Sequence, residues 1–495
     1  MRKIFKILYI INNKNISLGV NIMNKNINKK IVVIGITILF LSMIVAPSIN
    51  ANVADKIIVN SVEDNDNNDE DFDLLIICPN KFKRALNSLV KHKNNYNVSA
   101  RIVTLNQIYS QTESGRDDAE TVKYYIKDAY DNNNISYVLL VGGKKWQLNS
   151  WNCPVRYIQM GNSWESEILS DLYFADLYDS KGNFSSWDSD GDGLYGEWYY
   201  GEQPDDKYLD LHPEIAVGRL PCRNRLEVRI MVRKIIKYEK STYNRSWFWD
   251  LVAIAGDTYP EYQDEKWVGN EGEYYADLVI ENMSDFNAIK YYASDGPSPD
   301  ARNIKRAINK GCGFLYFNGH ASPRTWATHY TNSSKWTKAF TVNHIRLLRN
   351  RFKLPICVVG GCHTNQFDVS ILRFFNKQRR QHGEATPECW SWLLTRKIGG
   401  GSIATIGCSA LGFTKEDKES FDGGACILEV QFFKQYGNDN VDILGDAWAN
   451  SVSWYVDEFP VNWNQPLTND SWVDVQISQT WTLFGDPSLK MGGYP

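Results

Sequence analysis

The chain has 495 residues, of which 43% are hydrophobic and 13% aromatic. That length and composition suffice for a large core and exclude an intrinsically disordered chain. The formal net charge of −4 gives no electrostatic reason to expect a nucleic-acid partner.

The N-terminus has the pattern of a targeting segment. Two lysines at 29 and 30 precede an apolar run over 31–46, and small residues follow up to Ala51. This order is typical of a secretory signal peptide, and the run is shorter than the roughly 20 residues of a spanning helix. We therefore expect cleavage after residue 51, a secreted protein, and only transient contact with a membrane. The alternative is an uncleaved N-terminal anchor.

The segment 52–73 is polar and ends in "EDNDNNDEDFD", which predicts a solvated acidic linker. The nine cysteines are scattered without CxxC spacing, so no zinc or redox motif is predicted. Export permits disulfides. Their number is odd, so at least one cysteine must remain unpaired or bind another chain.

Strands alternate with helices from residue 74 onwards. An apolar strand at 74–78 is followed by a basic helix near 81–93, a strand at 99–105, a helix over 118–132 and a strand at 137–143. This alternation predicts parallel βαβ units, in which functional groups gather at the carboxyl ends of the strands.

The pattern loosens over 144–213 into a long aromatic and acidic insertion. A strand at 214–221 and an amphipathic helix over 224–241 then complete a first lobe, residues 74–240.

A second alternating series fills a C-terminal lobe, residues 241–490. Its apolar strands lie at 251–257, 313–320, 354–362 and 402–410. The predicted fold class is therefore α/β, with two lobes of parallel or mixed sheet flanked by helices.

Two of these strands end in glycine followed by a reactive side chain: His320 in "GFLYFNGHAS" and Cys362 in "LPICVVGGCHTNQ". If the strands are parallel neighbours, both side chains emerge at one edge of the sheet. A cysteine thiolate is a nucleophile, and a nearby imidazole can lower its pKa or protonate the leaving amine. The backbone N–H of Cys362 can face a developing oxyanion.

Other interpretations of these residues remain open. A cysteine in an apolar run usually acts as a small hydrophobic residue, as Cys312 and Cys357 are expected to do, and most histidines are structural. Cys408 also follows a strand and is a rival nucleophile, but it lacks a second glycine and a matching histidine-bearing strand.

The segments "NGHAS" and "GGCHT" resemble those of gingipain-type cysteine peptidases, within the group that includes caspases and legumains. Further stretches match in order: "SDLYFADL", "PEIAVGRLP" and "TLFGDPSLKM". The resemblance covers about residues 74–490. It implies a caspase-like and gingipain-like fold, with His320 as general acid and Cys362 as nucleophile.

The resemblance also implies roles for three other residues. Asp171 matches an acidic residue that orients the histidine, although a loop carboxylate or a calcium ligand is the alternative. Asp210 matches an acidic S1 residue, which would select Arg or Lys in the substrate. Ala321 would share the oxyanion hole with Cys362, but the family usually has glycine there, so its Cβ could crowd the substrate.

The segment "DSDGDGLYGEW" carries alternating carboxylates and a glycine at its sixth position. Such a pattern predicts a structural Ca²⁺ site with the ligands Asp188, Asp190, Asp192 and Glu197. The twelfth position is Tyr199 rather than Glu, so a standard EF-hand is not expected, and a solvated acidic loop is the alternative. No organic cofactor is expected.

These features together predict a secreted cysteine endopeptidase that hydrolyses protein or peptide substrates through a Cys–His dyad, with a possible preference for Arg or Lys. A sortase-like transpeptidase would use the same acyl-enzyme. A non-catalytic, calcium-stabilised binding or adhesion module is the alternative from another class, and Ala321 is the feature in its favour.

Overall fold

The computed structural model describes residues 71–495, apart from 163–164, 200, 261–269 and 415–422. Residues 67–495 form one compact unit. The expected signal peptide and nearly all of the expected acidic linker lie outside the described residues.

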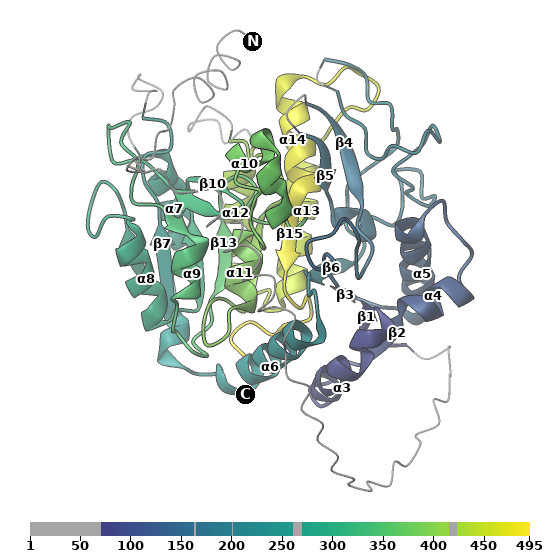
Figure 1. Cartoon of the computed structure of the whole chain (residues 1–495), viewed down its shortest axis with the longest axis horizontal. Coiled ribbons are helices and arrows are strands. Elements are labelled where there is room, and N and C mark those ends of the chain that lie inside the picture. Colours follow the sequence, from purple (N-terminus) through teal and green to yellow (C-terminus); the bar gives the residue numbers. More distant parts are fainter. Residues whose placement is uncertain (1–70, 163–164, 200, 261–269, 415–422) are drawn as a thin grey trace, which may run out of the picture. The chain divides into compact units, whose positions relative to one another are not determined.

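A ten-stranded sheet forms the centre of this unit (Figure 1). Its strands are short, and most of their residues are buried. In sheet order they are β2 (Ala100–Thr104), β1 (Leu74–Cys78), β3 (Tyr137–Val141), β6 (Ala216–Leu220), β15 (Trp481–Phe484), β14 (Ala404–Cys408), β13 (Ile356–Val359), β9 (Phe314–Phe317), β7 (Asp250–Ile254) and β8 (Asn287–Tyr291). The predicted α/β class is confirmed.

Only the β14–β15 pair within this sheet is antiparallel. The five strands from β2 to β15 therefore run opposite to the five from β14 to β8. These two halves follow the two expected lobes except for β15, which comes from the end of the chain and pairs with β6. One continuous sheet thus runs through both segments, 74–240 and 241–490.

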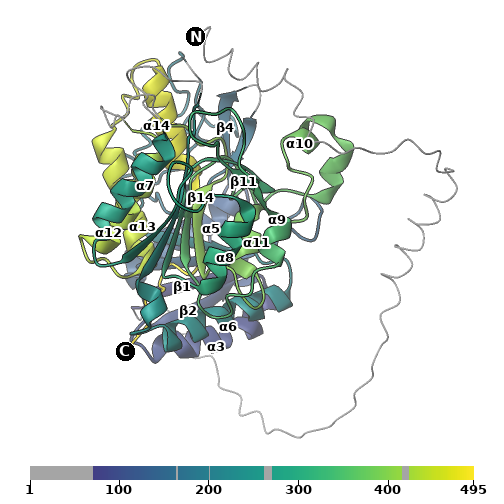
Figure 2. The same ribbon diagram turned by 90° about the vertical axis from the view of Figure 1, so that its left-hand side faces the viewer.

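Helices cover both faces of the sheet (Figures 1 and 2). They are α3 (Asn80–Asn94), α4 (Leu105–Gln111), α5 (Asp118–Asn133), α6 (Arg225–Ser241), α7 (Glu271–Asn282), α8 (Ala301–Lys310), α9 (Val342–Arg346), α10 (Lys377–Gln381), α11 (Trp390–Arg396), α12 (Ala425–Gly437), α13 (Leu444–Glu458) and α14 (Asn469–Thr480). Side-chain caps begin several of them. The side chain of Asn224, for example, accepts from two backbone N–H groups at the start of α6.

Smaller elements lie in the connections. The insertion 144–213 contains the hairpin β4 (Tyr157–Asn162) and β5 (Glu165–Leu169) and the turn η1 (Leu172–Phe174). A three-stranded sheet follows β9, with β10 (His320–Ser322), β11 (Thr325–Ala327) and β12 (Phe340–Thr341). The 3₁₀ turns η2 (Ser246–Trp249) and η3 (Ile371–Phe375) complete the described elements.

Successive residues of β9 pack into different hydrophobic clusters on the two faces of the sheet. Phe314 and Tyr316 pack into the larger cluster, whereas Leu315, Phe317 and Cys357 pack into the other. This alternation follows from the two-residue period of a strand buried on both faces. No helix in the described part of the chain is long and apolar enough to cross a membrane.

Candidate active site

Parallel strand pairing places His320 and Cys362 at one edge of the sheet. In the register of β9 and β13, Phe317 lies opposite Val359. His320 and Cys362 each follow these paired residues by three positions. The expectation that the two strands are parallel neighbours is therefore confirmed.

The two strand-to-loop turns also contact each other. A Cβ placed on Gly361 would lie 2.7 Å from the Cβ of Ala321 and 3.0 Å from its backbone nitrogen, and Gly361 has a φ of +136°. Only glycine combines this close approach with this backbone conformation at low cost. The residues predicted to supply the oxyanion N–H groups, Ala321 and Cys362, thus border the same turn.

The His320 ring has a defined orientation. Its Nε2 lies 2.8 Å from the carbonyl oxygen of Thr258, and a carbonyl can only accept, so Nε2 carries the proton. In the neutral ring Nδ1 is then the acceptor. The rings of Tyr259 and Trp336 pack edge-on against it, with centroid distances of 5.8 and 5.2 Å.

Cys362 differs from the other cysteines in its exposure. All nine lie in the described part of the chain and none is paired; eight are buried, and Cys362 is half-buried. Its Sγ lies 3.8 Å from the carbonyl oxygen of Gly412. Burial raises the pKa of Cys362 to about 11, and the nearby Glu165 carboxylate adds to this, although the contact with Gly412 opposes it. The sulfur is therefore a thiol at neutral pH.

The rival nucleophile Cys408 lies in β14 and is fully buried. Its Sγ contacts the hydroxyl of Thr480 at 3.3 Å. Burial also raises the pKa of the Cys408 thiol. A buried thiol of this kind is chemically inert.

An ion pair beside the nucleophile was not predicted from the sequence. His363 follows Cys362 with a φ of +60°, and its Nε2 lies 2.8 Å from Oε1 of Glu165. Glu165 belongs to β5 and also accepts from the backbone N–H of Leu411 at 3.1 Å. The insertion hairpin therefore contributes Glu165 to the surroundings of Cys362. His363 is one of eleven non-glycine residues with a positive φ in the described part of the chain.

A buried polar group behind the site was also missed. Oε2 of Glu429, in α12, accepts from the Tyr316 hydroxyl at 2.6 Å and from Nδ2 of Asn318 at 3.3 Å. Its Oε1 has no hydrogen-bond partner among the described residues. A Cβ on Gly360 would lie 2.8 Å from both carboxylate oxygens. Burial raises the pKa of Glu429 to about 8, so the neutral acid is favoured at pH 7.

The structure places Asp171 on Arg219 rather than on His320. The guanidinium donates from Nε and Nη2 to the two carboxylate oxygens, each at 2.7 Å, and both side chains are buried. Arg219 belongs to β6, which is four strand spacings from β9 in the sheet, or about 19 Å. The role expected for Asp171 is corrected accordingly: it forms a buried ion pair with Arg219, and a hydrogen-bond partner of the His320 ring among the described residues is the Thr258 carbonyl.

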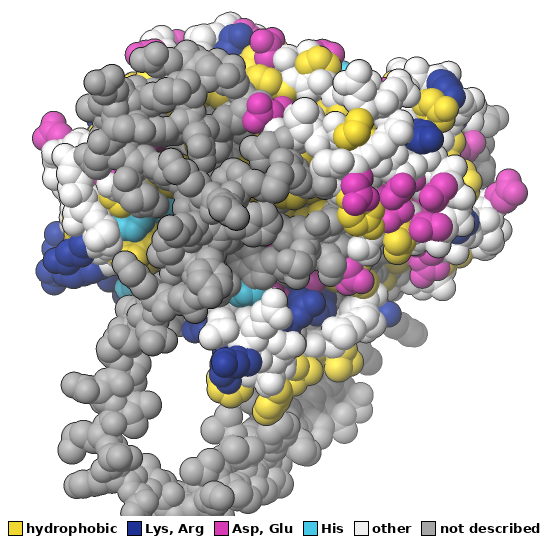
Figure 3. Space-filling view, turned by 90° about the horizontal axis from the view of Figure 1, so that it is seen from above, with side chains coloured by type: hydrophobic (Ala, Val, Ile, Leu, Met, Phe, Trp, Pro, Cys, Tyr) yellow, Lys and Arg dark blue, Asp and Glu magenta, His cyan; other side chains and the backbone are white. Residues whose placement is uncertain are grey.

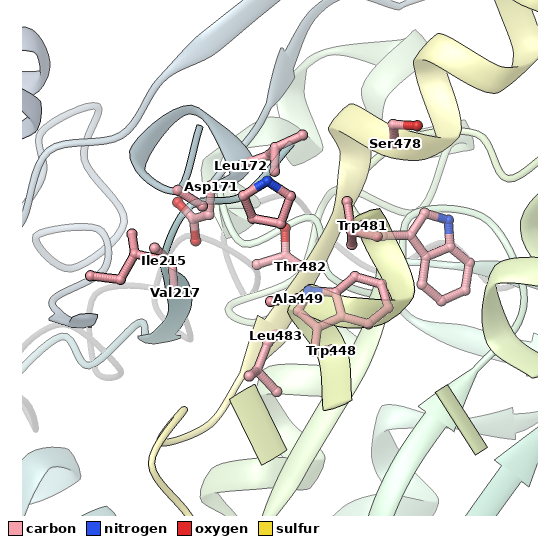
Figure 4. A pocket seen from close by; sticks show the side chains of 13 residues that line it. Asp171, Leu172, Ile215, Val217, Trp448, Ala449, Ser478, Trp481, Thr482 and Leu483 are labelled. Carbon is pink, nitrogen blue, oxygen red and sulfur yellow. The ribbon is translucent and has the colours of Figure 1, made fainter. Parts of the chain in front are cut away.

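Asp171 also lines a small cavity, which Figure 4 shows between η1, β6, α13 and β15. Trp448, Trp481 and Ile215 are among its other walls. Its volume of about 30 Å³ is enough for a water molecule rather than a peptide side chain. The cavity belongs to the core beside the ion pair.

Asp210 lies in the segment before β6. One carboxylate oxygen accepts from the backbone N–H of His212 at 3.2 Å. Burial raises the pKa of Asp210, and the negative charge of Asp179 adds to the shift. The neighbouring Asp176 and Glu214 are acidic too. The hydrogen bond of Asp210 thus lies within its own segment, whereas Asp176 and Asp179 come from the segment after η1. The expected S1 role of Asp210 stays a prediction.

The four predicted calcium ligands come together in two overlapping groups. Asp188 and Asp190 join Asp206, and Asp190 also joins Asp192 and Glu197, with ligand atoms within 4.8 Å of one another in each group. Figure 3 shows acidic side chains gathered on one side of the face that it draws.

The sequence interpretation missed Asp206, because it lies outside the DSDGDG pattern. It is almost fully buried, and its two oxygens accept from the backbone N–H groups of Ser189 and Glu197. Its burial and its position beside Asp188 become visible only in the folded loop.

Curated proteins similar to this chain include gingipains. Gingipain R2 of Porphyromonas gingivalis is 20% identical over 419 residues, which cover 84% of this chain and 45% of that protein. Lys-gingipain of the same species is 23% identical over 259 residues, which cover 50% of this chain and 13% of the relative. The chain thus spans less than half the length of these curated relatives.

Among solved structures, the Arg-specific cysteine proteinase gingipain R matches with a TM-score of 0.57 and 18% identity, over 85% of this chain and 78% of that one. The complex of gingipain pro- and mature domains from P. gingivalis gives the same TM-score. This likeness establishes the fold, in which a largely parallel sheet is flanked by helices.

The fold is the one found in the solved cysteine proteinase structures of this comparison. The family model of "Peptidase family C25" matches residues 67–492. The chain belongs to peptidase family C25.

Proposed function

We propose that this protein is a secreted endopeptidase that cleaves peptide bonds with Cys362 as nucleophile and His320 as proton carrier. The observation that carries the proposal is the register of β9 and β13, which brings a half-buried thiol and an oriented imidazole to two adjoining turns at one edge of the sheet. The family membership supports the same chemistry.

The reaction begins with proton transfer, because burial keeps Cys362 a thiol at neutral pH. Nδ1 of His320 accepts this proton while Sγ attacks the scissile carbonyl carbon. The imidazolium then protonates the leaving amine, and the C–N bond breaks to give a thioester. Water adds to the thioester with His320 as base, which releases the carboxylate product and restores the thiol.

The tetrahedral intermediates carry a negative oxygen that needs donors. The backbone N–H groups of Cys362 and Ala321 are the proposed donors, since both residues border the Gly361 turn. The Cβ of Ala321 points toward Gly361. This orientation supports the proposal that the Cβ does not block the substrate.

The proposal is tested by digesting a peptide library with residues 52–495 and sequencing the products. Cleavage that disappears in Cys362→Ala supports it. Preference for Arg or Lys before the cleaved bond that is lost in Asp210→Asn would support the S1 role of Asp210. Joining of added amines without hydrolysis would contradict the hydrolase and identify a transpeptidase.

We also propose that the acidic loop binds a structural Ca²⁺ through Asp188, Asp190, Asp192, Glu197 and the additional ligand Asp206. Carboxylate oxygens are the ligands that Ca²⁺ prefers, and within each of the two groups that share Asp190 the ligand atoms lie within 4.8 Å of one another. Burial raises the pKa of Asp206 to about 7, and the charges of Asp188 and Glu197 add to the shift. Arg116 forms an ion pair with Asp188, and a bound cation would compensate the remaining carboxylates.

Calcium is therefore expected to stabilise the fold in a pH-dependent way. The pKa of Asp206 rises from 3.8 to about 7 on folding, so in calcium-free buffer this group makes the protein less stable as the pH rises from about 4 to about 7. Bound calcium favours the ionised form, so stabilisation by calcium should grow over the same window. It should reach about 2.7 kcal/mol at ~100-fold excess over Kd.

Thermal unfolding with calcium and with a chelator, at several pH values, measures this effect. Asp206→Asn should abolish both the calcium effect and the pH trend. The exposed ligand variant Asp192→Asn serves as a milder companion, with weakened calcium binding and an unchanged calcium-free Tm. Equal Tm values with calcium and chelator at pH 7 would contradict the site.

Gly361→Ala should reduce kcat/KM by at least about ten-fold, because a Cβ would meet Ala321 at 2.7 Å and because φ is +136°. The clash would displace the turn that carries Cys362, and a displacement of about 1 Å in a reacting group can lower the rate about 100-fold. Ala321→Gly combined with Gly361→Ala removes the steric contact and should recover part of the loss. Kinetics on one peptide measures all three variants, and wild-type kinetics in Gly361→Ala would contradict the contact.

A further inference from the structure

Two segments far apart in the sequence form an exposed apolar surface. The Ser370 hydroxyl donates to the carbonyl oxygen of Gln147 at 2.8 Å, and the Ile371 N–H donates to Oε1 of Gln147 at 2.8 Å. These bonds hold the 145–149 loop against η3. Together the two segments carry six of the sixteen exposed large hydrophobic side chains in the described part of the chain: Trp146, Leu148, Ile371, Leu372, Phe374 and Phe375. We name these six residues the apolar tip.

The apolar tip is large. Phe375 is 87% exposed and Trp146 is 76% exposed, and the other four are about half exposed. At ~200 Å² for a large side chain, the six expose on the order of 700 Å². Monomeric proteins rarely exceed roughly 300–600 Å² in their largest apolar patch. The area therefore indicates a surface that is covered in use.

The apolar tip is convex and stands on a fixed base. No residue of η3 or α10 is buried, and Figure 2 shows α10 standing away from the sheet. Beneath it, Arg373 forms ion pairs with the buried carboxylates of Asp368 and Glu384. A rigid projection with outward apolar side chains is suited to insertion rather than to receiving a ligand.

Cationic side chains surround the apolar tip. The stretch 371–381 has four basic residues and no acidic one. Lys377 and Arg380 are exposed, as is Lys145 in the neighbouring loop, whereas Arg379 forms an ion pair with Glu384 at 2.9 Å. Hydrophobic and basic side chains stand together near the lower edge of Figure 3. Two copies of this surface would bring like charges together, which disfavours self-association.

We propose that the apolar tip and its basic rim dock this protein onto an anionic lipid surface. Elements that bind the membrane interface combine Trp, Phe and Leu with Lys and Arg. The exposed cations of the rim also complement the negative charge of anionic headgroups. The sequence alone predicted membrane contact only through the signal peptide.

Docking would also bring the catalytic edge close to the bilayer. After α10 the chain returns to the site, where a Cβ on Gly383 would lie 2.9 Å from the Ser322 hydroxyl oxygen. Ser322 is two residues beyond His320. Polypeptides at the membrane surface would then be the accessible substrates.

Vesicle flotation with residues 67–495, the compact unit, tests the proposal. The protein should float with phosphatidylcholine–phosphatidylglycerol vesicles at low salt, and little should float with phosphatidylcholine alone. Phe374→Ser with Phe375→Ser should lower the partition coefficient at least about ten-fold, because two deeply inserted side chains are lost. Lys377→Gln with Arg380→Gln should lower it roughly five-fold per charge and weaken its salt dependence.

Leu226→Ser with Tyr243→Ser is the matched control, since these side chains are 62% and 53% exposed elsewhere and their loss should not change flotation. Hydrolysis of a short soluble peptide should stay the same in all variants and reports that they fold. Wild-type protein that fails to float with anionic vesicles would overturn the proposal, as would unchanged flotation of the Phe pair. A dimer in sedimentation that the Phe pair dissociates would also overturn it, because the tip would then join two copies.

Discussion

Cys362→Ala is expected to lower kcat/KM for peptide cleavage by roughly 10⁴–10⁶-fold, the loss that accompanies removal of a catalytic nucleophile. The thiol supplies the atom that forms the acyl-enzyme, and the neighbouring turn supplies no other nucleophilic side chain in the same register. The Tm should stay close to that of the wild type, because a half-buried sulfur with one weak contact contributes little packing. Steady-state kinetics on a library-derived peptide measures the effect.

Cys408→Ala is the matched control for this experiment. Cys408 is the last residue of β14, the parallel neighbour of β13, and is fully buried against Thr480. Its loss should cost about 1–2 kcal/mol of stability through a small cavity and leave kcat/KM within about two-fold. Inactivation by Cys408→Ala together with activity of Cys362→Ala would reverse the assignment of the nucleophile.

Asp171→Asn is expected to lower the free energy of unfolding by about 3–5 kcal/mol, since it leaves the Arg219 guanidinium charged and without its counterion in the core. Arg219 is completely buried, and it also donates to the carbonyl oxygens of Gly142 and Pro154. The folded fraction should keep its kcat, because the ion pair lies three intervening strands away from β9. Denaturant unfolding and kinetics below the transition measure the two quantities.

This variant separates two roles for Asp171. A residue that orients the catalytic histidine would, when changed to Asn, lower kcat by about 10⁴-fold with little change in stability. That outcome would contradict the ion-pair assignment. A double-mutant cycle with Arg219→Met adds a direct measurement, and a coupling energy above about 1 kcal/mol between the two sites is expected.

The Asp171 segment shows why sequence reasoning failed at this point. The stretch "SDLYFADL" matched the family pattern in order, but a match in order does not give distance. Arg219 belongs to "PEIAVGRLP", 48 residues later. It contacts Asp171 only because the fold brings β6, which contains Arg219, next to the start of η1. A lone arginine in an apolar strand was the available signal, since such a charge needs a buried counterion.

The polar groups around the nucleophile could not be predicted from the sequence for a related reason. Glu165 and His363 are 198 residues apart, and Glu429 is a single acid in an otherwise ordinary helix. Nothing in the local sequence of Glu165 or Glu429 distinguishes these two residues from exposed acids. Their partners are defined by the packing of the insertion hairpin and α12 against the ends of β9 and β13.

The sequence by itself determined the alternation of strands and helices, the glycine-bearing turns after β9 and β13, and the residues His320 and Cys362 that follow them. These features depend on local periodicity and on the conformational freedom of glycine, which neighbouring residues encode. Only the tertiary structure decided that β15 joins the two halves into one sheet, that the His320 ring bonds to the Thr258 carbonyl, that Asp206 enters the acidic loop, and that the 145–149 loop is bonded to η3. Each of these depends on contacts between segments distant in the chain, and such contacts are fixed by how whole elements pack.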